Sequence, residues 1–251
     1  MMIGHVAAGS IIGAGLMVPS TAETFTCARV LVVGDLLRRV LEDIHSAQVL
    51  AALITRNDSV AELLSRSGLM VRPVVGTFST EADAAAGIGK PLNVVITATG
   101  THDAPMRRST VGVALVHSSV PLSQAAPDAV RFALANSKHQ QQLDITPSLL
   151  ARSQAVLARW RDRIAQWSQW SSRPVPASWR TAVVSALDDL DVARVIELMD
   201  ELENADHIEP GAKFEAFSYA DRVLGVDLMR DLGRVRRCFT TGTKGCMRTR
   251  S

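Results

Sequence analysis

The sequence predicts an α/β protein in which a domain built on a parallel sheet is followed by a bundle of helices. Apolar, β-branched runs alternate with amphipathic helical patterns over the first half, which is typical of strand–helix–strand units. From Pro127 onward only the helical period is visible, so we expect helices alone in the second half. Apolar residues make up 47% of the 251 residues, enough to bury a sizeable core.

The strands of the first half are predicted from short apolar runs, and its helices from the 3.6-residue period. The expected strands are 11–18, 49–54 and 92–99, with a further extended segment at 71–78. The expected helices are 28–47, 60–67 and 81–86. Gly87-Ile88-Gly89-Lys90 lacks the GxxxxGK[ST] frame of a phosphate-binding loop, so we interpret it as a helix end.

In the second half, Thr146 and Pro147 form an N-cap followed by proline at the first helical position. The helix that they open carries apolar residues at helical spacing as far as Trp167. Residues 171–176 (SSRPVP) have the composition of a linker. The other expected helices are 128–137, 179–187, 192–202 and 214–224. We interpret their apolar stripes as faces of a core.

Composition excludes several functional classes. Aromatic residues make up 4% and the net charge is +2, which does not favour a nucleic-acid surface spread over the whole chain. Cys27, Cys238 and Cys246 are too few for a disulfide framework, so we expect a cytoplasmic protein. No apolar run reaches the ~18 residues of a membrane span, and residues 1–19 lack the basic start of a signal peptide. The basic tail, 234–251, is either a solvated terminus or a phosphate-contacting segment.

Two stretches carry a resemblance to one family. CARVLVVGDLLRRVLE (27–42) resembles the helix after the HIGH signature of cysteinyl-tRNA synthetases. Residues 127–160 resemble the entry to the helical domain of these enzymes, called DALR after a motif here written Asp128-Ala129-Val130-Arg131. Residues 186–202 and 223–228 resemble later parts of that domain. The mycothiol ligase, a relative that joins cysteine to an amino sugar, is similar at the same landmarks.

The resemblance implies a fold and a division into domains. It implies a class I synthetase-like, Rossmann-like nucleotide-binding domain at 1–126, contracted between about residues 77 and 90. A DALR-like helical bundle would follow at 127–233, and then the basic tail at 234–251. In the family, the carboxylate of cysteine attacks the α-phosphate of ATP, so catalysis depends on positioning and on positive groups facing the phosphates. A zinc ion that binds the substrate thiolate gives selectivity.

The nucleotide-binding motifs of the family are degenerate here. HIGH falls on Thr24, Phe25, Thr26 and Cys27, where both imidazoles and the glycine are missing. Loss of such charge-stabilising donors typically costs about 10²–10³ in rate for each group. We therefore expect ATP binding, if retained, to be weak, and we assign no catalytic residue.

The best match to KMSKS follows Pro105 and consists of Met106, Arg107, Arg108 and Ser109. Arg108 stands where the second lysine of the motif stands, and arginine can hold phosphate.

The zinc site of the family is also expected to be lost. Gly15 and its small neighbours stand where the resemblance would put the first zinc cysteine. Only Thr101-His102-Asp103 stands near the later ligands, and one histidine with one aspartate does not close a zinc site. We therefore predict no metal.

These observations lead to three hypotheses. The first is a paralogue of the cysteine ligases whose adenylation is weak or lost, and which serves as an accessory protein that binds a tRNA or a partner synthetase. The second is an active ATP-dependent ligase for a small amino acid, with an altered substrate, in which Arg107 and Arg108 clamp phosphate and Cys27 or Thr24 lines the nucleotide site. The third is an RNA-binding module that uses the basic tail and the bundle.

Overall fold

The first half of the chain folds around a five-stranded parallel sheet. The computed structural model describes residues 6–57, 59–60, 62, 67–99 and 109–233. The strands are β1 (Ile11–Met17), β2 (Gln48–Ile54), β3 (Thr77–Phe78), β4 (Leu92–Ala98) and β5 (Ser109–Val113). Their order is β3-β2-β1-β4-β5, and every neighbouring pair is parallel. The predicted α/β class is therefore confirmed, with the strand order of a Rossmann-like sheet.

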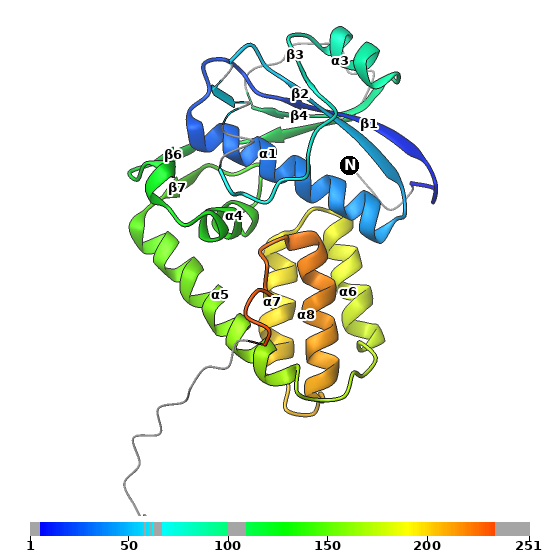
Figure 1. Cartoon of the computed structure of the whole chain (residues 1–251), viewed down its shortest axis with the longest axis vertical. Helices are drawn as coiled ribbons and strands as arrows, with labels where there is room; N and C mark the ends of the chain where they lie inside the picture. The colour runs from blue at the N-terminus through cyan, green and yellow to red at the C-terminus, as the bar shows by residue number, and fades with distance from the viewer. Residues whose placement is uncertain (1–5, 58, 61, 63–66, 100–108, 234–251) are drawn as a thin grey trace, which may run out of the picture.

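Helix α1 (Thr24–Arg39) packs on one face of this sheet, and α3 (Glu81–Ile88) packs on the other (Figure 1). Gly34 allows the close approach of α1, because a Cβ at this position would lie 2.1 Å from Cδ2 of Leu16 in β1. The helix continues through a π-helical turn, η2 (Val40–Ile44). Helix α3 ends at Gly89 in the left-handed conformation, so the glycine-rich stretch is a helix end, as predicted.

The second half is mainly helical. Its helices are α4 (Pro127–Ala135), α5 (Pro147–Trp167), α6 (Ala177–Asp188), α7 (Val192–Glu203) and α8 (Pro210–Leu224). The side chain of Thr146 accepts a hydrogen bond from the Leu149 amide, which confirms the predicted cap. The apolar stripe predicted for α7 is buried along its length. In Figure 1, α6, α7 and α8 lie below the sheet, and α1 runs between the two layers.

The expectation of helices alone after Pro127 was wrong. Strand β7 (Leu143–Ile145) lies between α4 and α5, and it pairs in parallel with β6 (Val116–Ser118). Neither strand is long enough to show a period-2 pattern. Strand β5 was also missed, because Val111 and Val113 are its only apolar side chains. Of the extended segment predicted at 71–78, only β3 is a strand, although Val75 and Gly76 also form backbone hydrogen bonds with β2. The helix predicted at 60–67 lies partly outside the described residues.

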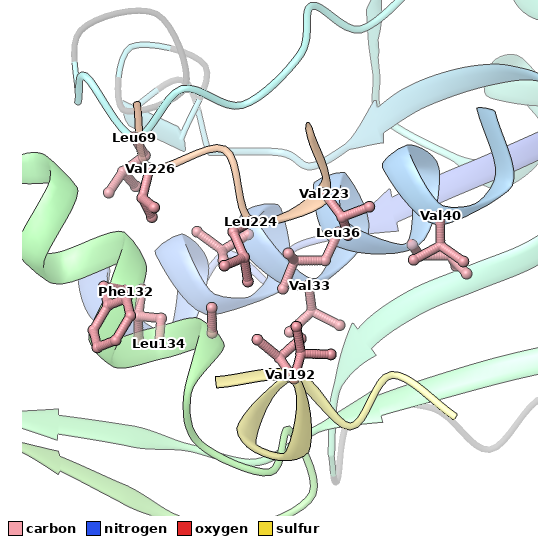
Figure 2. Packing of buried hydrophobic residues seen from close by; sticks show 14 of the residues in the cluster. Val33, Leu36, Val40, Leu69, Phe132, Leu134, Val192, Val223, Leu224 and Val226 are labelled. Carbon is pink, nitrogen blue, oxygen red and sulfur yellow. The ribbon is translucent and has the colours of Figure 1, made fainter. Parts of the chain in front are cut away.

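A single hydrophobic cluster joins the sheet, α1 and the bundle. Figure 2 shows part of it, where α1 meets the helical half. The labelled side chains there include Val33 and Leu36 of α1, Val40 of η2, Val192 of α7, and Val223 and Leu224 of α8. Burial of apolar area is the main driving force for folding. Docking of the two halves therefore contributes to stability, and their division at residue 126 remains a prediction.

Candidate functional site

A pocket of about 1060 Å³ opens where the chain leaves β1 and enters α1. Segments that follow the carboxyl ends of β1, β2 and β6 form its lining. The first contributes Ala22, Glu23, Thr24, Phe25 and Cys27, the second Asn57, Ser59, Val60, Glu62 and Ser67, and the third Ser118, Ser119, Val120, Pro121, Leu122, Ser123, Ala125 and Pro127. Parallel α/β sheets bind ligands at this edge, because the loops after their strands gather there. The pocket is therefore the candidate ligand site.

The first turn of α1 forms one side of the pocket. Its N-cap, Glu23, has an extended backbone, and the Glu23 side chain makes no capping hydrogen bond. The first amides of a helix have no partner within the helix, and the helix dipole favours negative charge beside them. This end of α1 therefore offers backbone donors, and its first turn carries no positively charged side chain.

The four residues at the HIGH-like position divide between two faces of α1. Thr24, Phe25 and Cys27 line the pocket. Thr26 is 1% exposed, and its Oγ1 lies 3.0 Å from the amide and 3.4 Å from the carbonyl oxygen of Val116 in β6. Its hydroxyl therefore holds β6 and does not face the pocket.

The Cys27 thiol is not activated. It is 3% exposed, and its Sγ lies 3.5 Å from the carbonyl oxygen of Ala22. Burial raises the pKa of the Cys27 thiol above its ordinary value of 9.0, because removal from water penalises the thiolate. A neutral thiol is a poor nucleophile and a poor metal ligand. Cys27 therefore acts at neutral pH as a small apolar part of the lining.

The described lining is rich in hydroxyl groups and contains two carboxylates, Glu23 and Glu62, but no lysine, arginine or histidine. His117 lies beside it, with Nδ1 3.7 Å from Oε2 of Glu23, and both side chains are exposed. A carboxylate beside a phosphate raises the energy of the bound state by repulsion. The described lining is therefore better suited to neutral or cationic groups than to a triphosphate.

The structure places Ser109, the last residue of the KMSKS-like stretch, at the exposed start of β5 and away from the pocket lining. Met106, Arg107 and Arg108 lie outside the described residues, as do residues 101–103 and the basic tail. Gly15 is in the middle of β1. Within the described ranges, no three His, Cys, Asp or Glu side chains gather as a metal site would require.

Sequence reasoning missed several pocket residues. Asn57 follows the carboxyl end of β2, and a polar residue just after a buried strand of an α/β fold is a recognisable signal. Ser118, Ser119 and Ser123 come from the stretch SSVPLS, whose serines and proline indicate a loop. Their place in the pocket depends on the pairing of β6 with β7, which the sequence did not reveal.

The stretch that resembles the DALR motif has a structural role. Arg131 is fully buried in α4, and its guanidinium donates to Asp35 of α1 at 2.6 Å. It also donates to the carbonyl oxygens of Leu69 (2.9 Å) and Leu224 (2.6 Å). Arg131 therefore links three parts of the chain: α1, the segment around Leu69, and the end of α8.

Fold and pocket together define a Rossmann-like α/β protein with a ligand-sized cavity at the carboxyl edge of its sheet and helices after it. The chain is distantly similar to cysteine–tRNA ligase and the mycothiol cysteine ligase, of the class I synthetase family.

The L-cysteine:1D-myo-inositol 2-amino-2-deoxy-alpha-D-glucopyranoside ligase of Acidothermus cellulolyticus is 29% identical over 161 residues, which cover 63% of this chain and 39% of that protein. The cysteine–tRNA ligase of Parvibaculum lavamentivorans is 32% identical over 127 residues, or 48% of this chain and 27% of that protein. The matches thus span well under half the length of either relative. No protein-family model matches the chain, and no helix in the described ranges is long and apolar enough to cross a membrane.

Proposed function

We propose that this chain is a ligand-binding relative of the cysteine ligases in which adenylation is weak or lost. The observation that carries the proposal is the chemistry at the first turn of α1. Thr24 and Phe25 carry no charge, Thr26 is bonded to β6, and the Cys27 thiol is buried with a raised pKa. None of the four places a positive side chain over a phosphate, which is where adenylation needs one. The strand and helix that frame the site are present, but these four positions carry no positive charge.

The accessory role rests on the resemblance and on the retained helical half. We propose that the bundle contacts a tRNA or a partner synthetase, since one of the two relatives is by name a cysteine–tRNA ligase. Several exposed arginines of the bundle are already paired with carboxylates, for example Arg159 with Asp200 and Arg194 with Glu197. Paired arginines contribute little to the release of counterions from nucleic acid. A partner protein is therefore a better candidate than a tRNA for binding to the helical bundle. The RNA-binding alternative depends on the basic tail.

A second candidate is an active ATP-dependent ligase with an altered substrate. The size of the pocket favours it, together with the N-terminus of α1, whose first turn is free of a capping side chain. Arg107 and Arg108 would then supply the phosphate clamp that the described lining lacks. The two candidates differ in whether an adenylate forms.

ATP–pyrophosphate exchange, measured with each amino acid in turn, separates the two candidates. The proposal expects background exchange throughout, together with weak or undetectable ATP binding in calorimetry. Exchange above background with any amino acid contradicts it and favours the active ligase.

A binding titration with a cysteinyl-adenylate mimic tests the pocket directly. Thr24→Trp serves as the pocket control, because Thr24 is exposed at the start of α1 and lines the cavity. A ligand that still binds this variant with unchanged affinity binds somewhere else.

A further inference from the structure

The side of the pocket that faces α1 is formed by residues 118–127, here called the pocket wall, which include one 3-10 turn, η3 (Leu122–Gln124). The pocket wall begins at the last residue of β6 and ends at the first residue of α4. It is joined to β7 as well, since the Ser119 amide donates to the carbonyl oxygen of Ile145 at 3.2 Å. A two-stranded sheet of three-residue strands is not stable by itself. The position of the wall therefore depends on what holds β6 and β7.

Thr26 holds β6 from the side of α1. Its Oγ1 accepts from the Val116 amide at 3.0 Å and can donate to the Val116 carbonyl oxygen at 3.4 Å. All of these atoms are buried. Val116 lies two residues before the wall begins.

Arg29 lies one helical turn after Thr26 on the same face of α1, and it binds the segments that precede β6 and β7. Its guanidinium donates to the carbonyl oxygens of Gln141 at 2.6 Å and Lys138 at 2.7 Å, and to Oγ of Ser137 at 2.9 Å. A longer contact of 3.3 Å reaches the carbonyl oxygen of Ala114, two residues before Val116. The side chain thus bridges both chain segments that lead into the small sheet.

The free-energy cost of burying Arg29 indicates that its guanidinium serves to fix the positions of the backbone groups that it binds. Arg29 is 0% exposed, all four acceptors are uncharged, and its Nε has no hydrogen-bond partner within the described residues. Burial lowers the pKa of Arg29 to about 10. An apolar side chain of similar volume would fill a core at lower cost, but it would fix no carbonyl group.

We propose that Thr26 and Arg29 are positioning residues that set the distance between the pocket wall and the first turn of α1. Thr26 and Arg29 lie on the same turns of α1 as the residues that line the pocket. A shift of the pocket wall relative to these turns therefore changes the width of the pocket. The inference concerns the pocket of the proposed function and rests on it. Neither residue contacts the ligand space itself, because neither lines the cavity.

Cys27 is a ligand-independent reporter of this gap, since it lines the pocket and is 3% exposed. In a background with Cys238→Ser and Cys246→Ser it is the sole thiol of the protein. Its labelling rate with a small thiol reagent, at one fixed pH, measures how often the wall opens.

We expect Thr26→Val to label about tenfold faster than the background protein, because two buried bonds are lost without a change in volume. Thr26→Ser keeps the hydroxyl and should label at the background rate. Trp179→Phe is the matched control, since it removes one buried bond, from Nε1 to the Leu198 carbonyl oxygen, inside the bundle. If Thr26→Val labels no faster than Trp179→Phe at equal loss of thermal stability, Thr26 is merely structural and the proposal fails.

Arg29→Lys provides a second test that does not depend on Thr26→Val folding. Lysine keeps the charge but cannot reach the same set of acceptors. Amide hydrogen exchange of residues 118–127 should accelerate in this variant, while exchange in α7 stays unchanged; uniform acceleration over the chain would overturn the proposal. Neither measurement uses a nucleotide, so a negative ATP experiment leaves this test intact, and a negative result here leaves the proposed function standing.

Discussion

The buried carboxylate of Asp35 is the position at which one isosteric change should cost most. Its Oδ2 accepts from Arg131 at 2.6 Å and from Arg39 at 2.7 Å, and its Oδ1 accepts from the Arg72 amide at 2.8 Å. The side chains of Asp35 and Arg131 are both 0% exposed. We predict the effect of Asp35→Asn, which keeps the volume and removes the charge.

The expected loss of stability follows from the hydrogen bonds that the asparagine can still form. The asparagine oxygen can still accept the Arg72 amide, but its amide group turns N–H donors toward two guanidinium groups. Breaking a buried ion pair from one side typically costs about 3–5 kcal/mol. For a chain of this length, each kcal/mol lowers the melting temperature by about 2–4 °C, so we expect a loss of roughly 6–20 °C.

Thermal unfolding followed by two probes provides the assay. All four tryptophans lie at Trp160, Trp167, Trp170 and Trp179, so their fluorescence reports the helical half, whereas circular dichroism reports the whole chain. We expect the two transitions to coincide in the unmodified protein, because a single core joins the halves. In Asp35→Asn the two transitions should separate, because the variant removes the ion pair between Asp35 of α1 and Arg131 of α4.

Two controls make the argument refutable. Arg194→Gln removes two exposed ion pairs, with Glu197 and Glu201, and should leave the melting temperature nearly unchanged. The double variant Asp35→Leu with Arg131→Met replaces both buried charges, and it should be more stable than Asp35→Asn. If Asp35→Asn costs less than about 1 kcal/mol, the buried pair does not stabilise the junction as described.

Three further predictions concern other positions. Gly225→Ala should destabilise more than Gly89→Ala in chemical denaturation, because both glycines have positive φ but only at Gly225 would a Cβ come close to guanidinium groups, 2.8 Å from Cζ of Arg39 and 2.9 Å from an Nη of Arg131. Equal losses would rule out the contact. Burial and then the nearby Arg29 charge lower the pKa of His139 from its ordinary 6.5, so the unfolded chain takes up a proton first. Stability should therefore be complete above pH 6.5 and fall as the pH drops below it, and His139→Gln should lack this dependence. The rate of Cys27 alkylation should still rise with pH above pH 9, since burial raises the pKa of this thiol above 9.0; a plateau at neutral pH would show an activated cysteine instead.

The sequence by itself determined the elements whose signal is local. The alternation of strands and helices gave the α/β class, the Thr146-Pro147 pair gave the start of α5, and Gly89 gave the end of α3. These features depend on backbone preferences and on the period of one segment, so neighbours in sequence suffice to reveal them. Thr24 and Cys27 were placed at a ligand site only through the resemblance to the HIGH signature, and the structure has both in the pocket lining.

Only the tertiary structure decided which side chains face the pocket and which hold it in shape. Thr26 stands between two pocket residues, yet its hydroxyl is used on β6, 90 residues away in sequence. β6 and β7 are too short to be recognised from sequence or to be stable alone, and Thr26 and Arg29 of α1 supply hydrogen-bond partners to β6 and to the segment before β7. Arg29 and Arg131 are charged residues that a sequence pattern places on the surface, and both are 0% exposed. The physical reason is the same in each case: a buried polar group must find its hydrogen-bond partners, and those partners come from distant segments that the fold brings together.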